Sequence, residues 1–347
     1  MTNKLPRLFY LDFIRAIAVF IIILTHYNAL YIYMVPPNLE KTLLIVYPFG
    51  IYIGNLGVSI FFIISGAALM YTYEKGTLDV KKFYIKRFSS IYPMWWTACI
   101  IAYSYWLLVY KTANPWGAAP WKILLTFIGF DQYFAHLTVT FGIIGEWFLG
   151  CIILIYIIFP FIRYWLIKQP IITIAIVLVL YLYFVFFNPW PLWTSVNIFV
   201  RLPEFMFGML FVKFGKNVNW KAFILALIIL ATTSWIHPGW SGDLKTTYIG
   251  IAFFVVLAYL ARFFQNSSEI KYFCSKICKY SYAIFISHHI VIYEVGKKIN
   301  LNTISYGNSI ALFIVCCEII AVVAFVLYHL HKWIVKQVRT VLSSKSF

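Results

Sequence analysis

The chain has 347 residues, of which 63% are hydrophobic, 21% aromatic and only 11% charged. Soluble domains contain roughly 25% charged residues, and a soluble globule could not hide this much apolar surface from water. The same composition excludes a disordered chain, and six cysteines are too few for a secreted disulfide scaffold. It predicts an all-α membrane protein that crosses the bilayer several times.

A membrane-spanning helix needs roughly 20 apolar residues, and the chain contains ten such stretches. Short loops with Pro and Gly signals, such as Asn188-Pro189-Trp190-Pro191, separate them. There is no internal repeat, long linker or soluble domain at either end, so we expect residues 1–347 to form a single integral-membrane domain. In chain order the expected spans are 8–27, 50–72, 86–109, 142–164, 169–187, 193–214, 220–237, 246–264, 280–296 and 308–331.

The net charge of +17 comes from small basic clusters between the apolar stretches. Such clusters are typical of topology signals and lipid contacts, so we expect the bilayer as a partner and no nucleic acid. With a cytoplasmic N-terminus, 20 basic residues lie in inside segments and 6 in outside loops, which favours N-in and C-in. Cys274 and Cys278 lack a second ligand pair, so no metal site is expected.

Charged side chains inside expected spans are functional candidates, because each costs roughly 2.5–3.5 kcal/mol on insertion scales. Histidines beside them add groups that titrate near neutral pH. The set comprises Arg15, Glu146, Arg201, Glu204, Glu294 and Glu318, with His26, His288 and His289.

The first expected span carries a cation and an imidazole on one face. Arg15 and His26 are 11 residues apart, which is about three helical turns and roughly 16 Å along the axis. A guanidinium can hold an oxyanion, and an imidazole can act as a base. The alternative is that Arg15 snorkels to the interface and His26 only marks it.

Five sequence blocks together resemble the acyltransferase-3 family of bacterial integral-membrane O-acyltransferases, in the stand-alone form without an SGNH domain. Their order along the chain matches the family, although Ser90 stands where the family often has a further Arg. The blocks are Leu11-Asp12 with Arg15 and His26, residues 57–66 (GVSIFFIISG), residues 83–93 ending in Ile91-Tyr92-Pro93, Glu146-Trp147-Phe148-Leu149 with Tyr156 and Pro160, and residues 281–288 (SYAIFISH).

The resemblance implies transfer of an acyl group, usually acetyl, from cytoplasmic acetyl-CoA to a hydroxyl of a cell-envelope polysaccharide or glycan. The expected location is then the bacterial cytoplasmic membrane. The expected partners are acyl-CoA as donor substrate and an envelope glycan as acceptor, with no tightly bound cofactor. Two alternatives stay open: a transporter or polysaccharide-export component, and a non-catalytic structural membrane protein.

On this hypothesis His26 acts as base or acyl carrier, and Arg15 holds the phosphates or thioester oxygen of the donor. Glu146 either orients His26 or pairs with Arg201. Because Arg201 and Glu204 are three residues apart on one helix, a structural ion pair is as reasonable as a catalytic one.

Four further residues have two interpretations each. Lys86 and Arg87 either contact the donor or serve as topology charges. His288 either contributes to the site or makes a hydrogen bond in the core. Trp147 either stacks on a sugar ring or belongs to the interfacial aromatic belt.

Overall fold

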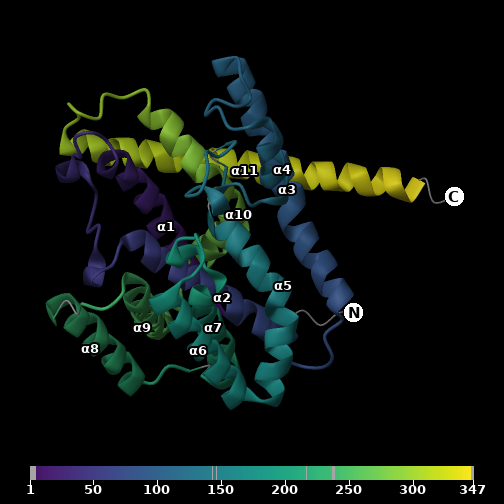
Figure 1. The fold of residues 1–347 in the computed structure, drawn as a ribbon, viewed down its shortest axis with the longest axis vertical. Helices are drawn as coiled ribbons and strands as arrows, with labels where there is room; N and C mark the ends of the chain where they lie inside the picture. The colour runs from purple at the N-terminus through teal and green to yellow at the C-terminus, as the bar shows by residue number, and fades with distance from the viewer. Residues whose placement is uncertain (1–4, 143, 146, 216, 237–238, 345–347) are drawn as a thin grey trace. The chain divides into compact units, whose positions relative to one another are not determined.

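The structure, a computed structural model, describes residues 5–142, 144–145, 147–215, 217–236 and 239–344. These residues form α-helices and short 3-10 helices and contain no strand (Figure 1). The α-helices are α1 (Phe9–Ile32), α2 (Ile53–Tyr73), α3 (Val80–Tyr110), α4 (Ile123–Ile128), α5 (Trp147–Lys168), α6 (Pro170–Phe187), α7 (Ile198–Phe214), α8 (Trp220–Ile236), α9 (Gly242–Phe264), α10 (Ser268–Gly296) and α11 (Tyr306–Ser344).

Each of the ten expected spans overlaps one of these helices, with α4 as an additional short helix. Six of the described helices are long and apolar enough to cross a membrane: α1, α2, α5, α6, α9 and the Tyr306–Gln337 part of α11. The other long helices are shorter or more polar. Helices α7 and α8 have 17 residues each, and α3 and α10 begin with basic segments.

The chain forms two compact units, each built from segments distant in sequence. The first unit comprises Met1–Ala29, Thr42–Leu78 and Cys151–Lys279; the second comprises Leu30–Lys41, Asp79–Gly150 and Tyr280–Phe347. A single domain over residues 1–347 stays a prediction.

Helices α2 and α7 pack closely in the first unit because glycines lie at the contact. A Cβ atom on Gly66 would collide with the main-chain oxygen of Phe205, and one on Gly208 with that of Ile63. Main-chain carbonyls therefore reach into both positions. Glycine is the residue that permits such an approach, because it has no Cβ.

The same block, residues 57–66, also contacts α1 and α9. A Cβ on Gly57 would lie 2.9 Å from Ile22 Cδ1 of α1. On the next face of α2, Ser59 occupies the space that a Cβ on Gly250 of α9 would need. The small residues of this block are therefore explained by helix packing, as in other membrane bundles.

Replacing Gly66 or Gly208 with alanine is expected to destabilise the first unit by about 2 kcal/mol or more, because the backbone must move to accept the methyl group. The matched control is Gly307→Ala on α11, where nothing lies within 4 Å of the added Cβ. Thermal unfolding in detergent, followed by a thiol-reactive dye at the buried Cys151, measures the difference. Equal unfolding temperatures for Gly66→Ala and Gly307→Ala would contradict the packing argument.

In the second unit, the segment between α3 and α5 is held by buried polar contacts. Asp131 Oδ2 accepts hydrogen bonds from the main-chain N–H groups of Phe141 (2.8 Å) and Gly142 (3.1 Å). The Trp95 indole N–H donates to the main-chain oxygen of Thr126 at 2.7 Å. The buried Lys122 donates to the main-chain oxygen of Val139 at 3.0 Å. These contacts shape the chain that leads into α5.

Arg163 of α5 is buried. Its guanidinium donates to the main-chain oxygens of Tyr73 (2.5 Å) and Gly76 (2.8 Å) at the end of α2. Helix C-termini leave carbonyl groups without intrahelical partners, and a cation there is favourable. Arg163 therefore caps α2 from a neighbouring helix.

Candidate functional site

Arg15 and His26 lie on one uninterrupted helix, α1, as the sequence predicts. Both side chains are half-buried, in contrast to most of their neighbours on the helix. A spacing of 11 residues places them within about 20° of each other around the axis, because each residue turns the helix by about 100°. The helix therefore presents the guanidinium and the imidazole on one stripe, near its two ends.

Packed apolar side chains occupy the middle of this stripe. Ala18, Val19 and Ile22 lie between the two polar residues and are buried, and Ile22 packs against α2 at Gly57. Arg15 and His26 are therefore separated along the stripe by apolar packing. Passage of an acyl group along this face would require Ile22 to move.

Asp12 precedes Arg15 by one helical turn and binds a different cation. Its Oδ2 pairs with Arg7 Nη2 at 2.8 Å, and this hydrogen-bonded carboxylate raises the pKa of Arg7. Arg7 Nη1 also donates to Ser275 Oγ of α10 at 3.0 Å. Within the described part of the chain, Arg15 has no hydrogen bond or ion pair. No acidic side chain of the described residues therefore occupies its guanidinium.

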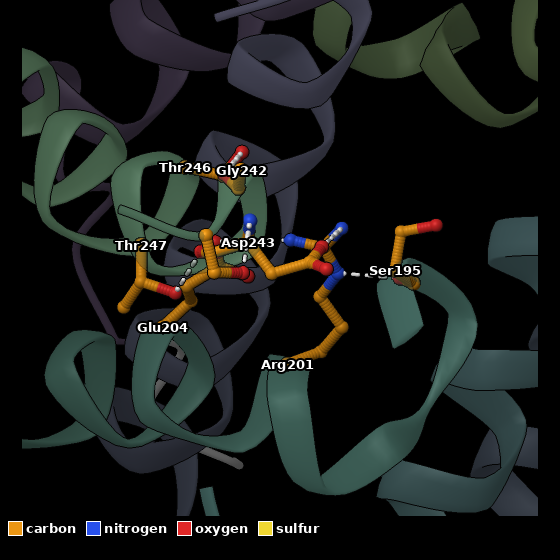
Figure 2. A network of polar contacts seen from close by, with 8 residues as sticks. Ser195, Arg201, Glu204, Gly242, Asp243, Thr246 and Thr247 are labelled. Carbon is orange, nitrogen blue, oxygen red and sulfur yellow. Dashed lines mark hydrogen bonds and ion pairs between the residues drawn. The ribbon is translucent and has the colours of Figure 1, made fainter. Parts of the chain in front are cut away.

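A second polar cluster lies in the first unit around Arg201 of α7 (Figure 2). Arg201 Nη1 pairs with Glu204 Oε1 at 3.4 Å, and Nη2 pairs with Asp243 Oδ1 of α9 at 3.7 Å. Its Nε donates to the Ser195 main-chain oxygen at 2.7 Å. The side chains of Arg201 and Glu204 are fully buried, whereas that of Asp243 is 18% exposed.

Two helix starts place these groups. Asn197 caps α7 by accepting a hydrogen bond from the Phe199 N–H at 3.0 Å, so Arg201 falls in the first turns of the helix. Ser241 caps α9 and accepts from the Asp243 N–H at 3.3 Å. Such caps satisfy N–H groups that have no intrahelical partner.

The burial of the Arg201 cluster favours a structural ion pair over a catalytic one. A group that reacts with substrate needs access, and Arg201 and Glu204 have no exposed surface. Removing the guanidinium would leave buried carboxylates without a counter-charge, which is costly. The sequence analysis missed Asp243 because this residue precedes the apolar stretch expected at 246–264. The pattern of Ser241 followed by Asp243 is typical of a helix start and could have placed Asp243 on the helix.

The other predicted cations lie in the second unit. Lys86 is exposed on α3, and Arg87 is half-buried with its guanidinium 5.9 Å from the centre of the Phe83 ring. Glu146 lies outside the described residues. The structure thus places Lys86 and Arg87 one after the other near the start of α3, and does not describe the predicted carboxylate.

His288 and Trp147 also belong to the second unit. His288 is fully buried on α10, and its Nδ1 lies 2.8 Å from the Phe285 oxygen and 3.2 Å from the Ile284 oxygen. Both partners are acceptors, so Nδ1 carries the proton. Both acceptors lie one turn earlier on α10 itself, and a role of His288 in the site stays a prediction. Trp147 is half-buried at the first residue of α5.

Glu294 has partners that its sequence position did not reveal. Its Oε2 accepts hydrogen bonds from Tyr110 (2.6 Å) and Tyr105 (3.1 Å) of α3, and its Oε1 lies 3.5 Å from Lys297 Nζ. The carboxylate therefore links α10 to the end of α3.

No group of three or more His, Cys, Asp or Glu among the described residues has the arrangement of a metal site.

The helices and their embedded charges define an all-helical membrane protein with at least six apolar helices of spanning length among the described residues. The acyltransferase-3 family model, described as an acyltransferase domain, matches residues 8–329. The chain belongs to this family, and the resemblance inferred from the five blocks is confirmed. It is therefore an acyl-transferring enzyme of a membrane. Neither the curated proteins nor the solved structures contain a significant match.

Proposed function

We propose that the protein is a multi-pass O-acetyltransferase of the bacterial cytoplasmic membrane. It transfers the acetyl group of cytoplasmic acetyl-CoA to a hydroxyl of a cell-envelope polysaccharide or glycan. The observation that carries this proposal is the first helix, where Arg15 is open to an anion and His26 lies on the same stripe. One end suits an anionic donor, and the other suits deprotonation of an acceptor.

The proposed topology has ten spans with both termini in the cytoplasm. The excess of Lys and Arg in the inside segments supports it. Helices α3, α7, α8 and α10 then cross the membrane together with the six more apolar helices. In this orientation Arg15 lies toward the cytoplasm, where acyl-CoA is available, and His26 lies toward the envelope.

Arg15 is the residue proposed to bind the acyl donor. The phosphates of acetyl-CoA accept hydrogen bonds, and a planar guanidinium offers several donors in a fixed geometry. Its lack of a partner in the described part of the chain supports this role, because no existing ion pair there has to break. Lys86 and Arg87 are proposed as further contacts for the phosphates.

His26 is the proposed general base. It takes the proton of the acceptor hydroxyl, whose oxygen attacks the thioester carbonyl and forms a tetrahedral intermediate. Collapse of the intermediate breaks the carbon–sulfur bond, and coenzyme A leaves as the thiol after receiving a proton. Ile22 packs between the two ends of the stripe. We therefore expect its side chain to shift when the thioester-bearing arm of acetyl-CoA enters.

The remaining residues have supporting roles in the proposal. Glu146, which lies outside the described residues, is proposed as a supporting carboxylate, a role that carboxylates commonly have in acyl transfer. Trp147 stacks on a sugar ring of the acceptor, since tryptophan offers a large rigid surface. His288 has a structural role within α10, where its Nδ1–H bonds main-chain oxygens one turn earlier, while Arg201 and Glu204 stabilise the first unit.

Surface glycans of cells that express the chain test the proposal. The cells are fed deuterated acetate, and their glycans are compared by mass spectrometry with those of empty-vector cells before and after mild base. We expect base-labile deuterated acetyl esters that depend on the chain. A protein present in the membrane at normal levels without any gain in esters would contradict the proposal. A change in the amount of exported glycan without new esters would indicate a transporter.

A further inference from the structure

We infer that Arg7 is a positioning residue that withholds Asp12 from Arg15 and so keeps the Arg15 guanidinium open for an anionic ligand. This inference rests on the proposed donor site at Arg15, where the ligand is a phosphate of acyl-CoA. The observation behind it is the pairing at the N-terminal end of α1, where Asp12 binds Arg7 at 2.8 Å.

Local helix geometry favours a different pair. Asp12 and Arg15 are three residues apart on α1, and side chains at this spacing are neighbours that commonly form ion pairs. An Asp12–Arg15 pair would occupy the guanidinium that the donor needs. In the structure, the carboxylate instead binds a cation that precedes the helix, five residues earlier in the chain.

One helix contacts Arg7 directly, and two helices contact the residues around it. Its Nη1 donates to Ser275 Oγ of α10 at 3.0 Å. The preceding Pro6 oxygen accepts a hydrogen bond from the Tyr71 hydroxyl of α2 at 2.8 Å. Cys278 Sγ of α10 donates to the Asp12 main-chain oxygen at 3.4 Å. The segment before α1 is thus anchored on both sides, and the cation does not rely on the carboxylate alone.

The charges at this end follow from the pairing. Arg7 neutralises Asp12, so Arg15 keeps an uncompensated positive charge. The Asp12 side chain is 15% exposed and that of Arg7 is 59% exposed, so water reaches the Arg7 side of the pair and the pair is worth a modest amount. Loss of Arg7 would leave Asp12 with a single cation within reach along its own helix, Arg15. Arg7 therefore controls the availability of Arg15 without contacting the donor.

Chemical modification reads the state of Arg15 without any donor. The purified full chain in nanodiscs is treated with phenylglyoxal, which reacts with accessible guanidinium groups, and the rate at Arg15 is followed by peptide mass spectrometry. We expect a rate about three- to fivefold lower in Arg7→Ala, as a modest ion pair would impose. In Arg7→Ala combined with Asp12→Asn, the rate returns to that of the wild type.

Two further variants separate this role from folding and from total charge. Arg7→Gln keeps a donor for Ser275 but removes the charge, so it is expected to slow Arg15 modification as Arg7→Ala does. Lys271→Ala removes a positive charge from the exposed face of α10 and is expected to leave the rate unchanged. A wild-type rate at Arg15 in both Arg7 variants, or a slow rate that Asp12→Asn does not restore, overturns the inference.

Binding of radiolabelled acetyl-CoA to the same samples links the pair to the proposed function. Arg7→Ala should bind about three- to fivefold more weakly than the wild type, and the double variant should bind like the wild type. Arg15→Ala is the reference for a lost donor site and should bind acetyl-CoA most weakly. If the wild type binds no acetyl-CoA, the proposed donor site is wrong, while the modification rates still decide the role of Arg7.

Discussion

Replacing His26 with alanine is expected to abolish glycan acetylation, lowering ester formation about 100-fold or more. The acceptor hydroxyl is almost fully protonated at neutral pH and attacks a thioester slowly. Without the imidazole, no group on this stripe of α1 takes the proton as the carbon–oxygen bond forms. The side chain is half-buried near the outer end of α1 in the proposed topology.

The measurement is the deuterated-ester assay on surface glycans, with each variant quantified in the membrane fraction. His329→Ala is the matched control, because His329 is an exposed histidine on α11 whose ring lies 3.5 Å from the Tyr280 hydroxyl. It is expected to retain wild-type acetylation. Normal acetylation by His26→Ala at normal protein levels would remove His26 from the mechanism.

Replacing Arg201 with methionine is expected to lower the free energy of unfolding by about 3–5 kcal/mol. The variant leaves Glu204 fully buried and Asp243 largely buried, without the cation between them. Such groups must then be desolvated with no compensating charge, and the Ser195 oxygen also loses its donor. Thermal unfolding in detergent, read by dye reaction at the buried Cys151, measures the loss.

A triple variant separates a structural role from a chemical one. Arg201→Met combined with Glu204→Leu and Asp243→Asn removes the whole charge cluster, and such replacements are often tolerated when partners are removed together. We expect it to recover most of the lost stability and to acetylate glycans. A triple variant that is stable and yet inactive would show that the cluster takes part in transfer.

Several features of the site were predictable because they depend on local geometry. The stripe of Arg15 and His26 follows from helical periodicity alone, and α1 is unbroken between them. The close approach of Arg201 and Glu204 likewise follows from their spacing of three. The motif blocks also identified the family, because short blocks in a fixed order can be recognised in the sequence without a structure.

Other features were not predictable, because they depend on which helices meet. Asp243 joins Arg201 only because α9 packs beside α7. Ile22 is an ordinary apolar residue in the sequence, yet its contact with Gly57 of α2 closes the middle of the stripe. Hydropathy also cannot show that Glu294 would meet two tyrosines of α3, since they are separated from it by more than 180 residues.

The sequence by itself determined that the chain is a helical membrane acyltransferase of the acyltransferase-3 family and that one helix carries a cation and an imidazole. Composition indicates the membrane class, the motif blocks indicate the family, and the repeat of a single helix places the cation and the imidazole on one stripe. The tertiary structure decided which charges pair, as with Asp12, which binds Arg7 rather than its helical neighbour. The physical reason is that ion pairs form between groups brought together by packing, and the contact that holds Arg7 comes from Ser275, 268 residues away.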